Sequence, residues 1–273
     1  MAKMPRYDDA FAQFRIEDEI ARLHGNPATG INAYVECCGR YTGENRLALR
    51  AISASGELRE FSFDDLADMS GRAANVLKAA GVGDGDVVAG MLPRVPELVA
   101  LILGTWRIGA VYQPLFTAFG PKAIEHRLGC SGAKVVVTDA VNRSKLAEVA
   151  ECPTIVTVAG AKGQGIVRGD FSFWAELANY CNDCEPVMLS GEDPFLLMFT
   201  SGTTGPSKAL SVPLKAIVAF QSYTRDAVDL RPEDAFWNVA DPGWAYGIYF
   251  GVTGPMSMGH PITFYDGPFT LES

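Results

Sequence analysis

Long apolar runs are scarce in this sequence of 273 residues. The longest such stretch, LVALILGTW at 98–106, is much shorter than the roughly 20 residues needed to cross a bilayer, and Arg107 follows it. The first 23 residues are charged throughout and contain no apolar core of the kind that a secretory signal has. We therefore expect a soluble, cytoplasmic protein without a membrane span.

Positive charge is also in short supply. The chain carries 23 Lys and Arg residues against 32 Asp and Glu residues, for a formal net charge of −9, and it has no block of basic residues. Proteins that follow a phosphate backbone usually have a basic face, so no nucleic-acid partner is expected. A nucleotide is compatible with an acidic chain, because a few backbone N–H groups and one Lys are enough to hold its phosphates.

The residues that usually bind zinc are few and dispersed. The three histidines, His24, His126 and His260, lie far apart in the sequence. Cys181 and Cys184 form a CxxC pair, but neither a second pair nor closely spaced histidines stand nearby to complete a zinc site. We interpret this pair as reduced structural thiols rather than as a metal or redox site.

Strand-like and helix-like patterns alternate in the middle of the chain. The apolar runs DVVAGM, AVYQPL, KVVVTD and TIVTVAG are predicted strands. The segments between them, 95–109, 121–132 and 142–151, have the spacing of apolar residues that is typical of helices. This alternation predicts βαβ units, and therefore an α/β fold with layered, mostly parallel sheets flanked by helices.

The remaining predicted elements flank this central part. Ser62 is the expected N-cap of a helix that ends just before Gly81. Further helices are predicted at 8–23, 31–41, 171–180 and 215–228, a hairpin at 46–63, and strands at 194–200, 235–240 and 261–267.

The segment directly after the strand at 194–200 suggests a binding site. It reads SGTTGPSK at 201–208, and ligands of α/β sheets bind beyond the carboxyl ends of strands. Gly202 and Gly205 allow successive backbone N–H groups to converge on an anion, and Lys208 adds a positive charge. Further hydroxyl donors are Ser201, Thr203 and Thr204. The composition therefore suits a polyphosphate.

Two other interpretations of this segment are weaker. A Walker A loop would require Gly where Ser207 stands and Ser or Thr where Ala209 stands, so that motif is excluded. A flexible surface turn would explain the Ser, Thr and Gly residues. Such a turn requires neither a Lys nor a strongly apolar strand before it, so we favour phosphate binding.

The segment also carries a family resemblance. TSGTTGPSKA at 200–209 resembles the T-S-G-[ST]-T-G-x-P-K-G loop of the AMP-forming (adenylate-forming) acyl-CoA synthetases, which include luciferases and peptide-synthetase adenylation domains. The resemblance extends from about Arg46 to the end of the chain, and the segments at 116–136 and 240–247 are similar to the acetyl-CoA synthetase branch. Two positions differ, because Ser207 stands where the family has Pro and Ala209 where it has Gly.

The resemblance implies an activity and a set of phosphate ligands. Family members activate a small carboxylic acid with ATP to an acyl-adenylate and pyrophosphate, and then pass the acyl group to coenzyme A. Lys208 is the implied catalytic residue, and Thr200 the implied contact to Mg²⁺. The implied ligands of ATP and pyrophosphate are Thr200, Ser201, Gly202, Thr203, Thr204, Gly205 and Lys208.

The resemblance also implies contacts to the other substrates. The acyl pocket would be formed by Trp244, Ala245, Tyr246 and Gly247. Ala245 and Tyr246 replace the Val-Thr that is typical of acetyl-CoA synthetases, so acetate is not assumed, and packing in the core is the alternative role of both. Arg143 and Lys145 are the implied contacts to coenzyme A, with ordinary surface charge as the alternative.

The expected domain organisation follows from the same comparison. Residues 1–45 would form an N-terminal helical extension and residues 46–273 an incomplete AMP-binding domain, without the family's C-terminal lid. We therefore expect the chain by itself to be inactive and to self-associate through surface that the lacking portion would cover. Two alternatives stay open: an adenylation domain that loads a carrier-protein thiol, and a non-catalytic nucleotide-binding or interaction module.

Overall fold

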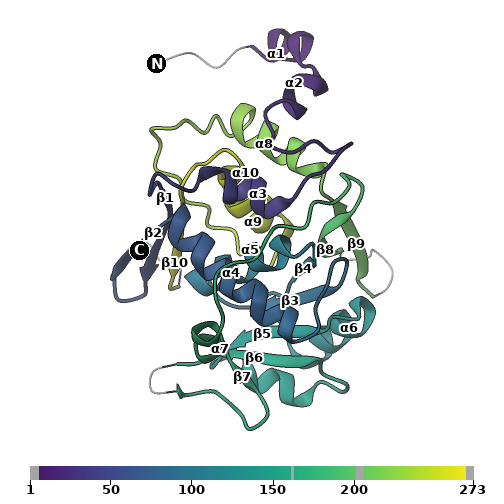
Figure 1. The fold of residues 1–273 in the computed structure, drawn as a ribbon, viewed down its shortest axis with the longest axis vertical. Coiled ribbons are helices and arrows are strands. Elements are labelled where there is room, and N and C mark those ends of the chain that lie inside the picture. Colours follow the sequence, from purple (N-terminus) through teal and green to yellow (C-terminus); the bar gives the residue numbers. More distant parts are fainter. Residues whose placement is uncertain (1–5, 161–162, 201–205, 269–273) are drawn as a thin grey trace.

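The computed structural model describes residues 6–160, 163–200 and 206–268 and has an α/β architecture (Figure 1). Its strands are β1 (Leu47–Ser53), β2 (Leu58–Ser62), β3 (Val87–Met91), β4 (Val111–Pro114), β5 (Val135–Asp139), β6 (Thr154–Val158), β7 (Phe171–Ser172), β8 (Pro194–Thr200), β9 (Lys208–Pro213) and β10 (Ile262–Asp266). The α-helices are α1 (Tyr7–Gln13), α2 (Ile16–Ile20), α3 (Ala33–Cys37), α4 (Phe63–Ala79), α5 (Pro96–Arg107), α6 (Pro121–Ser131), α7 (Phe173–Asn179), α8 (Ala216–Asp226), α9 (Ala245–Ile248) and α10 (Gly254–Ser257). Short 3₁₀ segments are η1 (Gly39–Tyr41) and η2 (Arg143–Glu148), and η4 (Tyr249–Thr253) is a π-helical turn.

The strands form two sheets. The larger sheet has the order β7-β6-β5-β3-β4-β8-β9, and its neighbouring strands are parallel except for the antiparallel pair β8 and β9. The smaller sheet has the order β10-β1-β2, in which β10 is parallel and β2 antiparallel to β1. The predicted α/β class with a mostly parallel sheet is confirmed.

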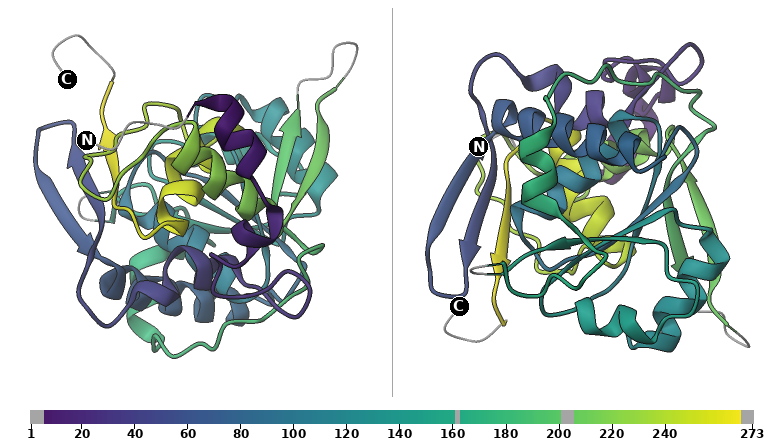
Figure 2. Two further views of the ribbon diagram at one scale, coloured as in Figure 1. Left: turned by 90° about the horizontal axis from the view of Figure 1, so that it is seen from above. Right: turned by 60° about the horizontal axis from the view of Figure 1, so that its bottom comes forward.

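Helices cover both faces of the larger sheet. Successive side chains of a strand point to opposite faces, so a strand between two layers of helices contributes to two cores. In β5, Val135 and Val137 belong to the main hydrophobic core, whereas Val136 belongs to a second core with Ile124 and Leu128 of α6. Helices α4, α5 and α7 pack on the first face and α6 on the second, and Figure 2 shows this layering. The apolar strand runs that predicted a buried sheet therefore fill two cores.

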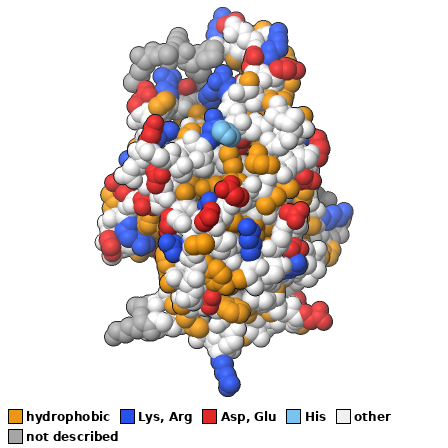
Figure 3. All heavy atoms as spheres, in the orientation of Figure 1, with side chains coloured by type: hydrophobic (Ala, Val, Ile, Leu, Met, Phe, Trp, Pro, Cys, Tyr) orange, Lys and Arg blue, Asp and Glu red, His pale blue; other side chains and the backbone are white. Residues whose placement is uncertain are grey.

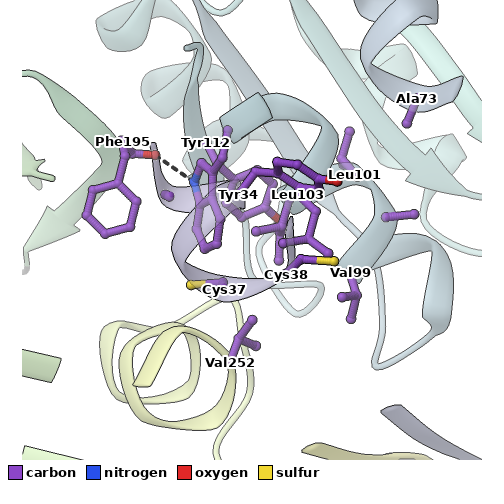
Figure 4. Close-up of a cluster of buried hydrophobic side chains, with 14 of the residues drawn as sticks. Tyr34, Cys37, Cys38, Ala73, Val99, Leu101, Leu103, Tyr112, Phe195 and Val252 are labelled. Atoms are coloured by element: carbon purple, nitrogen blue, oxygen red, sulfur yellow. Dashed lines mark hydrogen bonds between the residues drawn. The ribbon is translucent and has the colours of Figure 1, made fainter. Parts of the chain in front are cut away.

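The main core joins distant parts of the chain around Trp106 of α5. The Trp106 indole N–H donates to the Phe195 carbonyl of β8 at 3.0 Å, and the two rings lie 5.3 Å apart (dashed line in Figure 4). Tyr34 and Cys37 of α3 are buried in the same cluster. The side chain of Asn32 caps α3 and also donates to the Trp106 carbonyl at 2.8 Å. Residues around α3 are thus part of the core.

The predicted ends of two helices agree with the structure. Ser62 and Asp65 form a reciprocal capping box at the start of α4, and Gly81 follows the helix with a φ of 82°, a conformation that favours glycine. Pro121 occupies the first turn of α6, where its missing N–H costs no hydrogen bond. These local sequence signals therefore mark where α4 begins and ends and where α6 begins.

Several predicted elements differ from the structure. The helix predicted at 8–23 is two short helices, because the backbone is extended at Phe14 and Arg15. The segment 142–151 contains the 3₁₀ segment η2 instead of an α-helix. The segment 235–240 was predicted as a strand but makes a single bridge, from Trp237 to Thr263 of β10. Strand β9 was not predicted, because it lies at the sheet edge and most of its side chains are exposed.

The charge distribution on the surface and the length of the helices reflect what the sequence has few of: basic blocks and long apolar runs. Acidic and basic side chains are interspersed on the face drawn in Figure 3, without a continuous basic area. Across the described ranges, no helix is long and apolar enough to span a membrane.

Candidate functional site

The candidate site lies at the carboxyl edge of the larger sheet. Strands β4, β5 and β8 run in the same direction, so the segments that follow them emerge at one edge. The segment after β4 contains Phe116 and Phe119, and the segment after β8 is the predicted phosphate loop. Residues 241–247 also pack here, because a Cβ added at Gly243 would lie 2.6 Å from the Phe116 Cα. The topology therefore gathers segments that are far apart in the sequence.

The predicted loop connects β8 to β9. These strands form an antiparallel pair in which Thr200 lies directly opposite Lys208, and both residues are exposed. The backbone pairing therefore fixes the two ends of the loop next to each other. The remaining predicted phosphate ligands, Ser201, Gly202, Thr203, Thr204 and Gly205, lie outside the described residues.

Helix α6 supports the second end of the loop. His126 of α6 lies with its Nε2 2.9 Å from the Ser207 carbonyl oxygen, and Ser207 directly precedes Lys208. The His126 ring packs edge-on against Phe199 of β8, with ring centroids 6.3 Å apart. One helix thus contacts both strands of the hairpin.

Arg127, the next residue of α6, gives this region a positive charge. Its guanidinium lies 4.1 Å from the Phe119 ring centroid and 5.5 Å from that of Phe199, and it donates to the Ala123 carbonyl at 2.9 Å. Within the described part of the chain, no carboxylate forms an ion pair with it. Burial lowers the pKa of Arg127, although an Arg stays protonated at neutral pH. The charge is therefore available to an anion.

An aromatic group adjoins this cation. The rings of Phe116, Phe119 and Trp244 have centroids 5.5 to 5.7 Å apart. Trp244 is 47% exposed, and both Trp244 and Arg127 contact the Phe119 ring. The group thus presents an apolar surface next to Arg127, and it contains Trp244, one of the four predicted acyl-pocket residues.

The next predicted pocket residues have different neighbours. Tyr246 packs against Phe250 with ring centroids 5.0 Å apart, and a hydrogen bond with Tyr223 of α8 raises the pKa of Tyr246. Gly247 is buried, and a Cβ at this position would collide with the Asp241 carbonyl oxygen. Ala245 is the first residue of α9 and packs at the edge of the main core. The structure therefore places Trp244, but not Tyr246, in the aromatic group.

Comparison with known proteins identifies the family to which the chain belongs. Residues 40–272 match the family described as AMP-binding enzyme. The chain belongs to this family.

Several relatives show how this chain compares with known members of the family. It is 33% identical over 262 residues to the acetyl-coenzyme A synthetase of Gemmatimonas aurantiaca, and 30% identical over 276 residues to that of Bacillus subtilis. The two matches cover 87% and 99% of this chain, but 40% and 48% of the relatives. The crystal structure of an acyl-CoA synthetase from Brucella canis superposes with a TM-score of 0.95 at 60% identity, covering 98% of this chain and 49% of that one. The predicted resemblance is confirmed, and the chain spans about half the length of these relatives or less.

Both cations predicted to contact coenzyme A have protein partners in this chain. Arg143 donates to the two carboxylate oxygens of Asp170 at 2.6 and 2.8 Å, and the two side chains are 10% and 3% exposed. Lys145 donates to the Thr117 carbonyl and, at 2.9 Å, to the Asn142 side chain. Arg143 thus stabilises the fold around η2 and Lys145 holds the segment after β4, and their contact with coenzyme A stays a prediction.

The protein offers few ligands for a metal ion. Among residues 6–160, 163–200 and 206–268, no three His, Cys, Asp or Glu side chains gather as a metal site. Mg²⁺ commonly binds to substrate phosphates with only one or two protein ligands, and Thr200 presents a suitable oxygen at the loop. The contact of Thr200 with Mg²⁺ stays a prediction.

Sequence reasoning missed His126 and Arg127. Both lie in the segment at 116–136 that carries the resemblance, so a signal was present. Their role depends on the contact of α6 with β9, and that strand was itself not predicted.

Proposed function

We propose that this chain is part of an AMP-forming acyl-CoA synthetase. The protein would activate a carboxylic acid with ATP to an acyl-adenylate and pyrophosphate, and then transfer the acyl group to coenzyme A. The observation that carries this proposal is the β8–β9 hairpin, which sets Thr200 opposite Lys208 at the carboxyl edge of the sheet. The family membership and the names of the relatives support it.

The chemistry requires positive charge at this edge. A carboxylate that attacks the α-phosphorus of ATP brings two anions together, so the site must neutralise and orient charge. Lys208 would bind the β and γ phosphates, and Arg127 would add a second cation beside the loop. A bound Mg²⁺ would neutralise further phosphate charge, with the Thr200 hydroxyl as its protein contact. The loop residues at 201–205 would complete the phosphate ligands.

The acid would bind next to the phosphates. Phe116, Phe119 and Trp244 form an apolar surface that suits the hydrocarbon part of a small carboxylic acid. Ala245 and Gly247 follow Trp244 in α9, and their backbone would limit the size of this site. Gly247 would contribute no side chain, because a Cβ there would collide with the Asp241 carbonyl oxygen. Coenzyme A is the proposed thiol because the relatives are acetyl-coenzyme A and acyl-CoA synthetases.

Isothermal titration of the chain tests this proposal. Because the relatives are about twice as long, the reaction belongs to the whole protein, and the measurement on this chain is binding. We expect Mg-ATP and pyrophosphate to bind with one site per chain and adenosine to bind more weakly than ATP. If circular dichroism shows a folded chain that binds neither phosphate ligand, the proposal is contradicted.

Arg127 provides a second prediction about the site. Replacing Arg127 with Met keeps the side-chain stem against Phe119 but removes the charge, so the affinity for pyrophosphate is expected to fall about fivefold to tenfold. Lys122→Met removes an exposed cation from the same helix and serves as the control. Titration calorimetry of both variants shows whether the Arg127 charge contributes specifically to pyrophosphate binding. Equal losses of affinity in the two variants would contradict a specific contribution and show only an effect of net charge.

A further inference from the structure

His126 is held on several sides in the structure. A carbonyl oxygen can only accept, so the His126 Nε2 carries the hydrogen that is donated to Ser207 at 2.9 Å. In the neutral imidazole, the Nδ1 atom then has a lone pair, and the Cys130 Sγ lies 3.7 Å from it on the next turn of α6. The Cys130 thiol can therefore donate to Nδ1 and favour this tautomer, while Phe199 packs against the ring.

The acceptor of this bond is at a critical position in the chain. Ser207 is the last residue before β9, and Lys208 is the first residue of that strand. Strand β9 lies at the edge of the sheet and pairs only with β8 among the described strands. The ends of edge strands open more readily than central strands, because they have fewer hydrogen bonds to hold them.

The sequence gives a reason for an external support at Ser207. The acyl-CoA synthetase loop pattern has Pro directly before its Lys, where the ring fixes φ near −65°. This chain has Ser207 at that position and Pro206 one place earlier, so φ of residue 207 is not fixed by a ring. A hydrogen bond from a neighbouring helix to the Ser207 carbonyl restricts the backbone of the same residue through the peptide that follows it.

We propose that His126 is a positioning residue of the phosphate site. Its bond to the Ser207 carbonyl fixes the orientation of the peptide from which Lys208 extends, so the Lys208 ammonium meets the phosphates in one arrangement. This inference rests on the proposed function and assigns a role to α6 in it.

Two substitutions separate the hydrogen bond from the packing of the ring. His126→Phe keeps an aromatic ring against Phe199 but has no donor for the Ser207 carbonyl. His126→Gln loses the ring but keeps an N–H donor of similar reach. Lys122→Met on the same helix is the control, because Lys122 is an exposed cation of α6.

Limited digestion with trypsin tests the positioning without a ligand. Trypsin cleaves after Lys208, and cleavage in a folded protein follows the local opening of the segment. Mass spectrometry of the peptide that ends at Lys208 should show about fivefold faster cleavage in His126→Phe, the factor expected for loss of one hydrogen bond. His126→Gln and Lys122→Met should be cleaved at nearly the rate of the unsubstituted chain.

Titration with pyrophosphate gives the functional measurement. His126→Phe should bind pyrophosphate about fivefold more weakly than the unsubstituted chain, and His126→Gln should restore most of the affinity. Rescue by Gln distinguishes the hydrogen bond from a general effect on packing.

The results separate this inference from the proposed function. If His126→Phe and His126→Gln are cleaved alike and bind alike, the positioning role of His126 is overturned even though phosphate binding stands. If the unsubstituted chain binds no pyrophosphate, the proposed function fails, and the role of His126 in fixing Lys208 is then decided by the cleavage rates alone.

Discussion

Replacing Lys208 with Ala is expected to weaken pyrophosphate binding by about 10- to 100-fold. A hydrogen bond to a charged group contributes about 1.5–3 kcal/mol, and in this variant the ammonium next to the bound phosphates is lost. Lys208 is exposed at the start of β9, so its removal should leave the fold intact. Isothermal titration of both proteins with pyrophosphate and with Mg-ATP gives the affinities.

The ionic strength and a conservative variant serve as controls for Lys208. Charge interactions at an exposed site weaken with salt, so the affinity of the unsubstituted chain should fall more steeply between low and high salt than that of Lys208→Ala. Lys208→Arg keeps the charge and should retain part of the affinity. Unchanged binding in Lys208→Ala would show that the hairpin is not the phosphate site.

Replacing Arg143 with Met is expected to lower the free energy of unfolding by about 3 kcal/mol. The substitution leaves the Asp170 carboxylate, which is 3% exposed, without its cation, and an unpaired buried charge is strongly destabilising. Arg50→Met is the control, because the Arg50–Glu60 pair is 34% and 51% exposed and should contribute less than about 1 kcal/mol. Urea denaturation of the three proteins measures the difference.

The pH dependence of stability provides a second measurement of the same pair. Burial raises the pKa of Asp170, but hydrogen bonds from Arg143, Thr157 and the Val167 N–H, together with the Arg143 charge, lower it below its ordinary value. A carboxyl with a lowered pKa contributes stability that is fully present above its unfolded pKa of about 4 and is lost as the pH falls through the folded pKa.

The two measurements together test the structural role of Arg143. In Arg143→Met, the part of the free energy of unfolding that this pair contributes should already be missing at neutral pH. The loss of that part as the pH falls should therefore be absent from the variant. A variant of unchanged stability at neutral pH would contradict the structural role of Arg143.

The sheet could be predicted from the sequence where strands are buried on both faces. Strands β3 and β5 are continuous apolar runs, because each fills two cores, and helices separate them at regular spacing. Strand β9 could not be predicted, since an edge strand with exposed Ala209 and Leu210 has no clear periodicity. The segment 235–240 is aromatic and apolar, which favours a strand. In the described structure it forms only an isolated bridge, from Trp237 to Thr263, because tertiary packing overrides the local preference.

The candidate site could be predicted only where its residues are contiguous. The segment at 200–208 shows its chemistry in one short run of hydroxyls, glycines and a Lys. The contacts of Phe116 with Trp244, and of His126 with Ser207, join residues about 80 or more positions apart. Only the order of the strands brings such residues to one edge, so no local pattern reveals them.

Nuclear magnetic resonance of the isotope-labelled chain can locate the phosphate site residue by residue. Pyrophosphate would be titrated into the protein while the backbone amide signals are followed. We expect the largest shifts at Thr200, Ser207 and Lys208 and on α6 near Arg127, and we expect Lys208→Ala to reduce them strongly at the same ligand concentration. Shifts confined to another part of the chain, or their absence in a folded protein at millimolar pyrophosphate, would contradict the assignment of the β8–β9 hairpin as the phosphate site.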